Sequence, residues 1–206
     1  MANDAVIRHF TVGPLETNCY VVSDPATKEA CVIDPGGDPA EIKDYLGANS
    51  LELKFIINTH GHGDHIAANS RFKVPIYIHR LDGDFLTDTS LNLSKAFAFG
   101  ITSPRAARLL EGGERIKLGG LDLEILHTPG HTPGSISVKV GGSVFTGDAL
   151  FAGGVGRTDF EYGDTDLLMR SIAEKLFTLD DRTVIYPGHG PGSTIGEEKR
   201  TNPFFR

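Results

Sequence analysis

The sequence contains no tryptophan and only 2 cysteines among its 206 residues. A single pair of cysteines cannot form the dense disulfide framework of a small secreted scaffold. Cys19 and Cys31 both lie in apolar, strand-like stretches, which suits buried thiols in a reducing compartment. Residues 1–10 also lack the cationic and apolar parts of a signal peptide, so we expect a cytoplasmic protein.

Long apolar runs and positive charge are also scarce. No run approaches the roughly 20 apolar residues that a membrane-spanning helix needs, which argues against a membrane protein. The 20 basic residues are outnumbered by 27 acidic ones, which gives a formal net charge of −7. Because non-specific nucleic-acid binding depends on neutralising phosphates, an acidic chain without a basic run is not expected to bind nucleic acid.

Glycine, by contrast, is abundant with 25 residues, and 39% of the chain is hydrophobic. This composition is typical of a loop-rich globular α/β protein, and we expect one domain over residues 1–206. Apolar runs between turn signals predict strands at 6–12, 18–23, 30–33, 53–57, 74–79, 115–117, 121–126, 135–140, 143–146 and 183–186. Helical spacing and start signals predict helices at 38–47, 66–72, 81–86, 103–110 and 165–177.

The densest group of metal-binding side chains follows the predicted strand 53–57. Three histidines and one carboxylate fall within six residues, at His60, His62, Asp64 and His65. Neutral imidazole and carboxylate are good ligands for zinc and similar divalent ions. His60 and His62 can share one direction while Asp64 and His65 point elsewhere, so the spacing favours two metals roughly 3.5–4 Å apart. Open α/β sheets place such sites at the carboxyl ends of their strands.

The pattern His-x-His-x-Asp-His over 60–65 resembles the signature of the metallo-beta-lactamase superfamily. That resemblance implies further ligands downstream, and the chain has matching residues after predicted strands at His131, Asp148 and His189. It implies a first metal held by His60, His62, His131 and Asp148. It implies a second metal held by Asp64, His65, His189 and Asp148, whose two oxygens allow it to bridge.

The same resemblance implies the superfamily's αββα sandwich, in which two facing sheets with outer helices hold the metals at one edge. Two divalent ions, zinc in the first place with iron or manganese as alternatives, lower the pKa of a shared water. The expected activity is metal-dependent hydrolysis of an acyl bond by a metal-bridging hydroxide. Asp64 is expected to act in catalysis by orienting that hydroxide as well as by binding metal.

Within the superfamily, residues 128–132 and 145–151 are similar to the glyoxalase II group, the hydroxyacylglutathione hydrolases. The implied substrate is a small-molecule glutathione thioester such as S-lactoylglutathione. The Gly-Val-Gly-Arg segment 154–157 lies where that group has a basic residue that contacts glutathione. Arg157 is therefore implied to bind a substrate carboxylate, with a structural ion pair as the alternative interpretation.

The chain departs from the long glyoxalase II enzymes, which add a C-terminal helical domain with further glutathione contacts. Only a short tail follows His189, and segment 188–200 resembles the short, single-domain, glyoxalase II-like branch instead. Lys199 and Arg200 in that tail either replace the missing contacts and bind substrate or are solvated charges. Asp159 stands where the glyoxalase II group has a tyrosine contact.

Three features lie outside the ligand pattern. Two of them have two alternative interpretations, and the third is interpreted as structural. Asp34 lies in an Asp-Pro-Gly-Gly turn, where it either caps the turn or supports a metal ligand from beneath. His127 comes directly off a predicted strand but matches no ligand position, and we interpret it as structural. The long segment 80–110 contains Phe97 and Phe99, and its apolar residues either cover the site as a lid or simply pack.

The main alternative function is that of a persulfide dioxygenase, an oxidoreductase on the same scaffold with a single non-haem iron. Those enzymes also carry the Arg-Thr-Asp-Phe sequence found at 157–160. The complete set of seven ligands favours two metals and hydrolysis, and it also argues against a non-catalytic metal-binding protein. A secreted beta-lactamase would need a signal peptide, and a nuclease would need a surface for nucleic acid.

Overall fold

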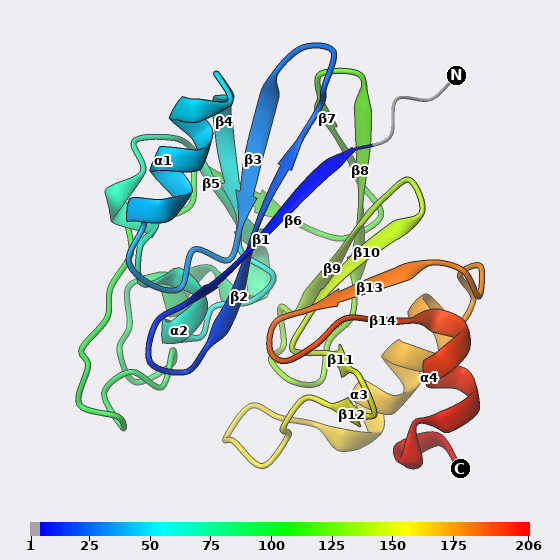
Figure 1. Cartoon of the computed structure of the whole chain (residues 1–206). Helices are drawn as coiled ribbons and strands as arrows, with labels where there is room; N and C mark the ends of the chain where they lie inside the picture. Colours follow the sequence, from blue (N-terminus) through cyan, green and yellow to red (C-terminus); the bar gives the residue numbers. More distant parts are fainter. Residues whose placement is uncertain (1–4) are drawn as a thin grey trace.

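Two six-stranded sheets pack face to face in the computed structural model, which describes residues 5–206 (Figure 1). The first sheet contains, in spatial order, β1 (Val6–Val12), β2 (Thr17–Ser23), β3 (Glu29–Ile33), β4 (Glu52–Ile57), β5 (Ile76–His79) and β6 (Arg108–Leu110). The second contains β14 (Ser193–Thr194), β13 (Val184–Pro187), β10 (Ser143–Gly147), β9 (Ile136–Val140), β8 (Leu121–His127) and β7 (Arg115–Leu118). A small ribbon of β11 (Leu150–Phe151) and β12 (Gly154–Val155) follows β10.

Each sheet mixes parallel and antiparallel pairs. In the first sheet, β1, β2 and β3 pair antiparallel, whereas β3, β4, β5 and β6 run parallel. In the second sheet, β7 to β10 form an antiparallel meander, and β13 lies parallel to β10. Parallel neighbours end at the same edge of a sheet, so the loops that follow them can converge on one site.

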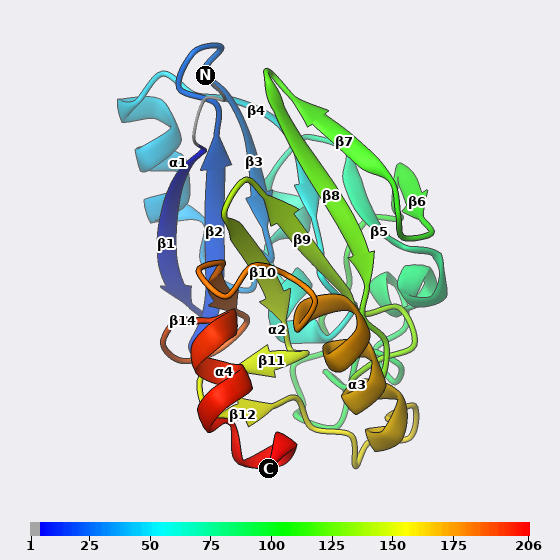
Figure 2. The ribbon, with the colours of Figure 1, turned by 90° about the vertical axis from the view of Figure 1, so that its right-hand side faces the viewer.

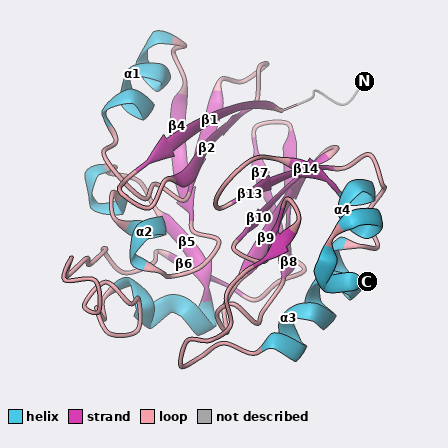
Figure 3. Cartoon of the chain, turned by 60° about the horizontal axis from the view of Figure 1, so that its bottom comes forward, coloured by secondary structure: helices cyan, strands magenta, loops and turns pink. Residues whose placement is uncertain are grey.

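Helices cover the two outer faces, so the layers run helix, sheet, sheet, helix (Figure 1, Figure 3). The first sheet is covered by α1 (Ala40–Ala48) and the short α2 (Gly63–Ile66). The second sheet is covered by α3 (Thr165–Ser171), which continues through a π-helical stretch at Ile172–Leu176, and by α4 (Ile195–Thr201). Figure 2 shows these two helices in front of the strands. The αββα sandwich expected from the sequence is confirmed.

Alternating apolar side chains along the strands build three buried layers. In β4, Ile57 packs in the central layer between the sheets, whereas Ile56 packs in the outer layer with residues of α1. The central layer combines both sheets and includes Tyr20, Ile33, Leu123, Val138 and Phe145. Because each sheet is buried on both faces, the strand ends are held in fixed positions, which a metal site requires.

Segment 103–110 corrects one prediction. A helix was expected there, but Arg108–Leu110 forms β6 and residues 101–106 have no regular structure. The strand pairs with β5, and its side chains alternate between solvent and the interior: Leu109 is exposed and Leu110 is buried. A contact between strands that are distant in sequence thus overrides the local pattern.

The region after the ligand cluster also differs from the prediction. The expected helix 66–72 is replaced by the earlier α2 and a 3-10 turn at Asn69–Arg71. The acidic segment forms a 3-10 helix at Arg80–Leu86, close to the expected 81–86. The C-terminal α4 and the 3-10 turn Pro203–Phe205 were not predicted. Within residues 5–206, no helix combines the length and the apolar character needed to cross a bilayer.

Candidate metal centre

All seven predicted metal ligands come together at one edge of the sandwich. The first sheet supplies four of them, from the loop after β4 and from α2: His60, His62, Asp64 and His65. The second sheet supplies three, from the β8–β9 loop and from the ends of β10 and β13: His131, Asp148 and His189. The strands thus act as the rigid supports, and the ligands lie in the short segments that follow them.

The ligand atoms fall into overlapping groups in which every atom lies within 4.8 Å of the others. One group consists of His60, His62 and His131, a second of His60, His65 and Asp148, and a third of Asp64, His65 and His189. Each group is small enough for its members to bind one cation. Together the groups contain every ligand that the sequence predicted.

Asp148 lies between the two outer groups. Its Oδ2 is 3.6 Å from Nε2 of His131 and 3.6 Å from Nε2 of His189. Its Oδ1 is 3.4 Å from Nε2 of His65. Oδ2 is thus equally distant from a histidine of each outer group, the arrangement that a bridging ligand would need.

Buried polar atoms without a hydrogen-bond partner also indicate a metal site in the cluster. Among the buried side-chain atoms of residues 5–206, Nε2 of His65 and Oδ1 of Asp148 have no hydrogen-bond partner. Leaving a buried polar atom unpaired costs about 1–3 kcal/mol, so such atoms are rare in folded proteins. A divalent cation would satisfy both atoms at once, and a set of imidazole nitrogens and carboxylate oxygens suits zinc, iron or manganese.

Four of the histidine ligands are oriented by a partner of their Nδ1 atom. The partners are Thr59 Oγ1 for His60 (3.2 Å), Asp34 Oδ2 for His65 (3.0 Å), the Arg157 carbonyl for His131 (2.7 Å) and the Leu15 carbonyl for His189 (3.1 Å). Each of these rings therefore turns Nε2 toward the cluster. His62 presents Nδ1 instead, 2.9 Å from Nε2 of His131.

Three of the histidines favour the neutral form. Burial lowers the pKa values of His60, His62 and His131, and for His60 and His62 the neighbouring histidines lower them well below the ordinary value. A neutral imidazole keeps a free lone pair, which is the form that binds a cation. These three residues therefore form a group that is ready to accept a metal without losing protons.

His65 differs because carboxylates surround it. Burial alone would lower its pKa, but Asp64, Asp148 and Asp34 outweigh burial and raise the pKa to about 10. Burial would raise the pKa of Asp64, yet His65 and His189 together hold it below its usual range. A bound cation would take over the role of the His65 proton in balancing these carboxylates.

Asp34 supports the centre from beneath. Its Oδ2 contacts the ring of His65 and accepts a hydrogen bond from the hydroxyl of Thr59 at 2.6 Å. Its Oδ1 accepts from the backbone N–H of Thr59 at 2.7 Å. Of the two interpretations open from the sequence, the supporting role is therefore the one that the structure shows.

Asp82 was not among the predicted site residues, yet it joins two ligand loops. This buried carboxylate accepts from the backbone N–H of Gly61 at 2.9 Å, inside the His-Gly-His segment. It also accepts from the hydroxyl of Thr132 at 2.7 Å and the N–H of Gly134 at 2.6 Å, in the β8–β9 loop. Burial raises the pKa of Asp82 to about 6, although these hydrogen bonds oppose the rise. A lone aspartate in an acidic segment carries no sequence signal for this role.

Two glycines allow the backbone to approach the ligands closely. A Cβ atom at Gly188 would collide with Oδ1 of Asp148 and would lie 2.9 Å from Cε1 of His65. A Cβ atom at Gly36 would collide with the backbone carbonyl of Asp64. A larger residue at either position would push a ligand out of place.

Of the three predicted substrate-binding residues, Arg157 is the one that the structure brings to the centre. Its guanidinium forms a bidentate ion pair with Asp159, at 2.9 and 2.8 Å, and lies 4.4 Å from the ring centre of Phe160. The residue also lines the cavity over the ligands. The structural ion pair and a position on the cavity wall are therefore both present.

Lys199 and Arg200 are not brought to the centre, which corrects their prediction as substrate contacts. They belong to α4, on the outer face of the second sheet. Lys199 pairs with Asp181 at 2.6 Å, and Arg200 pairs with Glu197 at 2.7 Å. Neither residue lines the cavity over the metal ligands.

His127 has the structural role that the sequence suggested. Its ring stacks on that of His79, with ring centres 4.0 Å apart, and its Nε2 lies 3.0 Å from the carbonyl of Pro133. Within residues 5–206, neither His127 nor His79 belongs to a group that could hold a metal. The two rings instead join β5 of the first sheet to β8 of the second.

A cavity of about 1010 Å³ opens over the ligands and contains atoms of His62, Asp64, His131, Asp148 and His189. Part of its wall comes from the long segment whose aromatic residues had two interpretations. Phe97 and Phe99 both line the cavity and are exposed.

An αββα sandwich with histidine and carboxylate groups at one edge defines a class of metal-binding proteins. The model of the metallo-beta-lactamase superfamily matches residues 12–189, and the chain belongs to this superfamily. Similar relatives include the hydroxyacylglutathione hydrolase GloC of Haemophilus influenzae, 39% identical over 97% of each chain. The probable metallo-hydrolase YqgX of Bacillus subtilis is 39% identical over 96% of each chain.

Solved structures show the same fold over 96% or more of the chain. The BLEG-1 B3 metallo-beta-lactamase matches with a TM-score of 0.92 and 38% identity, covering 97% of this chain and 99% of that one. TTHA1623 in a di-iron-bound form matches at 0.85 with 36% identity, covering 96% and 99%. ETHE1 from Myxococcus xanthus matches at 0.77 with 33% identity, covering 96% and 83%. Because these similar proteins carry different names, the fold alone does not select a substrate.

Proposed function

We propose that this protein is a binuclear metallohydrolase that cleaves thioesters, with glutathione thioesters such as S-lactoylglutathione as substrates. The observation that carries the proposal is the position of Asp148, 3.4 Å from His65 on one side and 3.6 Å from His131 on the other. The name of GloC supports the reaction, and the di-iron form of TTHA1623 supports the use of two metals. We propose zinc as the metal, with iron or manganese as alternatives.

When bound in this site, two divalent cations would supply a water of lowered pKa as nucleophile and would polarise the acyl carbonyl. The chain prepares the surroundings for that reaction. Asp64 stays ionised because its pKa is held low, and it accepts a hydrogen bond from the hydroxyl of Thr17 at 3.1 Å. Asp64 can therefore orient the attacking water as well as bind metal. The backbone acceptors of His131 and His189 hold both rings in place before substrate arrives.

We propose that Arg157 binds a carboxylate of the thiol half of the substrate. A guanidinium has five N–H donors, so the pair with Asp159 leaves donors for a second acceptor. The partner is a small molecule, and no nucleic acid or membrane takes part. We place the reaction in the cytoplasm, because free buried thiols at Cys19 and Cys31 suit a reducing compartment.

The second candidate function is that of a persulfide dioxygenase with a single non-haem iron. The similarity to ETHE1 and the Arg-Thr-Asp-Phe sequence at 157–160 favour it. A single iron would leave several of the clustered histidines and carboxylates without a role. The bridging position of Asp148 therefore favours the hydrolase.

The test is hydrolysis of S-lactoylglutathione by protein reconstituted with zinc, and separately with iron, followed by the loss of thioester absorbance. We expect turnover that stops when a chelator removes the metal. His131→Gln should lose metal and most activity. His127→Gln is the matched control, because His127 lies just before the same loop but outside the cluster. This variant should retain both its metal and its activity.

Two results would change the assignment. Protein that carries two metals and leaves every glutathione thioester intact is not a thioester hydrolase of this kind. Oxygen uptake with glutathione persulfide by iron-loaded protein would then establish the dioxygenase in its place.

A further inference from the structure

Exposed apolar side chains gather at the mouth of the metal cavity. Leu15, Phe97 and Phe99 are exposed by 45%, 51% and 55%, and all three line the cavity that contains the metal ligands. Large apolar side chains are normally buried, so a cluster of them beside a reactive centre indicates a surface that binds something apolar. A molecule bound in this cavity can therefore contact these residues as well as the metal ligands.

The segment that carries the two phenylalanines, residues 92–101, is here called the Phe loop, and its base is firmly built. Asn92 and Ser94 are buried. The Asn92 amide donates to the carbonyl of Ile101 at 2.9 Å, and Ser94 Oγ accepts from the N–H of Ile101 at 2.9 Å. The N–H of Phe99 donates to the carbonyl of Ser94 at 2.9 Å. The exposed rings therefore project from a closed, hydrogen-bonded loop.

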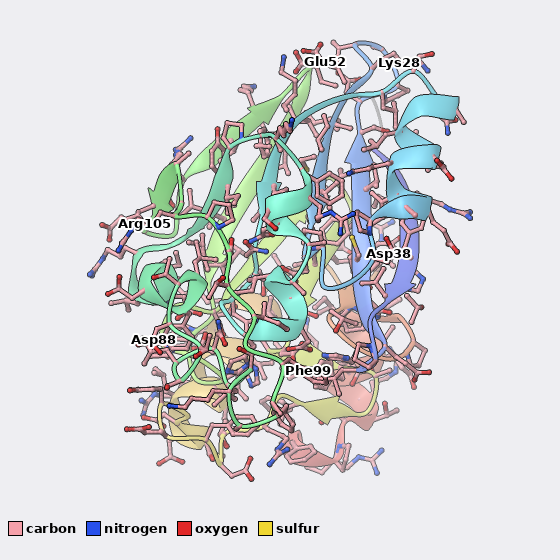
Figure 4. All side chains as sticks on the ribbon, turned by 90° about the vertical axis from the view of Figure 1, so that its left-hand side faces the viewer. Lys28, Asp38, Glu52, Asp88, Phe99 and Arg105 are labelled. Atoms are coloured by element: carbon pink, nitrogen blue, oxygen red, sulfur yellow. The ribbon has the colours of Figure 1, made fainter. Side chains whose placement is uncertain are left out.

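The Phe loop is also fixed relative to the metal ligands. The carbonyl of Asn92 accepts from the N–H of Gly63 at 2.9 Å, one residue before the ligand Asp64. A Cβ atom at Gly63 would lie 3.0 Å from Cβ of Ser94, so helix and loop are in close contact. Figure 4 shows Phe99, which belongs to this loop, near α2. The apolar wall thus has a defined position beside the centre.

The wall of the cavity carries the cations Arg157 and Arg71, and its apolar part includes the Phe loop. Arg157 lies beside His131, because its carbonyl accepts from that ring, and its guanidinium offers a site for a carboxylate. The Phe loop lies beside Asp64 and offers apolar surface. Glutathione is polar and carries carboxylates, so it suits the side of Arg157. The acyl group of the same thioester then falls toward the Phe loop.

We propose that Leu15, Phe97 and Phe99 form a binding wall for the acyl half of the substrate. The preferred substrates are thioesters with an extended apolar acyl group, and S-lactoylglutathione is a slower one. This inference rests on the proposed thioesterase function and specifies its substrate class. The wall residues determine specificity and do not touch the reacting atoms. Because each methylene removed from water adds to binding, kcat/KM should rise with acyl chain length.

The first experiment compares kcat/KM of the zinc-loaded enzyme for the S-acetyl, S-lactoyl, S-hexanoyl and S-octanoyl derivatives of glutathione. We expect S-octanoylglutathione to exceed S-acetylglutathione by about tenfold or more. The double variant Phe97→Ala/Phe99→Ala should reduce this ratio by about tenfold. Phe204→Ala is the matched control, because Phe204 is also exposed by 55% but does not line the cavity, and it should leave the ratio unchanged. Equal kcat/KM values across the series, in an enzyme that hydrolyses S-lactoylglutathione, would overturn the acyl wall and leave the hydrolase intact.

A binding measurement separates the wall from the reaction. S-octylglutathione and S-methylglutathione are thioethers that cannot be hydrolysed. We expect calorimetry to show about tenfold tighter binding of S-octylglutathione, and the double variant should lose that difference. Tight octyl binding without any thioester turnover would keep the apolar site and reject the hydrolase. Equal binding of the two thioethers would reject the apolar site.

Discussion

Oδ2 of Asp34 lies 3.0 Å from Nδ1 of His65, which leaves the opposite nitrogen of the ring facing two further carboxylates. Nε2 of His65 is 3.5 Å from Oδ2 of Asp64 and 3.4 Å from Oδ1 of Asp148. One buried imidazole therefore stands among three carboxylates. Its charge state couples metal binding to pH.

Metal binding to the metal-free protein should release a proton from His65. Burial lowers the pKa of His65, but the three carboxylates outweigh it and raise the pKa to about 10, so the ring is protonated at neutral pH. Since the bound form needs a free nitrogen, the apparent zinc affinity should rise by at least about tenfold per pH unit from pH 7 to pH 9, below that pKa. Calorimetry in buffers of different ionisation enthalpy would count the protons. Asp34→Asn removes one carboxylate and should reduce the proton release, and an affinity independent of pH would contradict this assignment.

Asp148→Asn should lower both metal content and activity. An amide has one oxygen and no charge, so it cannot bridge two cations as a carboxylate does. We expect a loss of about 10²-fold or more in kcat, with less than two bound metals by elemental analysis. Asp122→Asn, an exposed aspartate of β8, is the control and should change neither quantity. Full activity of the Asp148→Asn protein would remove the bridging role.

Asp82→Asn should weaken metal binding through the two loops that it joins. The amide nitrogen cannot accept from Gly61, Gly134 or Thr132, so at least one of these hydrogen bonds is lost. We expect about 10-fold to 100-fold lower metal affinity, measured by competition with a chelator, and a lower Tm.

Asp24→Asn provides a closely matched control for Asp82→Asn. Asp24 is also buried, and it accepts from two backbone N–H groups, of Ala26 and Gly120, and from one hydroxyl, of Thr27. The Asp24→Asn protein should have a lower free energy of unfolding, by about 1–3 kcal/mol for each group left unpaired. Its metal affinity should stay unchanged. If both variants lose metal affinity equally, the effect of Asp82 is one of general stability and not of ligand positioning.

Gly188→Ala should disturb the centre although it changes no ligand. The new methyl group would collide with Oδ1 of Asp148 and press on the ring of His65. We expect a loss of about 1–3 kcal/mol in the free energy of unfolding and a lower metal content. Gly142→Ala should have little effect on metal content, because nothing lies within 4 Å of a Cβ atom there. Normal metal content in Gly188→Ala would show that the strand end can shift without cost.

The ligands could be predicted from the sequence because each lies in a short segment directly after an apolar run. Such runs mark buried strands, and the residues that follow them share an edge of the sheet. His131, Asp148 and His189 were therefore found from local patterns together with the resemblance to a known family, and the structure brings them together. Asp34 also follows a strand, and for this reason the support of a metal ligand was one of its two interpretations.

Other features depend on contacts that no local pattern contains. Asp82 meets Thr132 across 50 positions of sequence, so only the folded chain shows its role. Strand β6 forms where β5 offers it a partner, and the local sequence of 103–110 predicts a helix. The basic charges of Lys199 and Arg200 suggested substrate contacts, but the packing of α4 directs them to Asp181 and Glu197.

Each outer ligand group draws on both sheets, His131 joining His60 and His62, and His189 joining Asp64 and His65. Bound metal would therefore connect the two layers and add to the free energy of unfolding. At a free metal concentration of about 1000 times Kd, this contribution amounts to about 4 kcal/mol. In a cell, chains without metal would unfold more often and be degraded sooner. Metal shortage would thus reduce the amount of this protein as well as its activity, and its abundance would follow the metal supply.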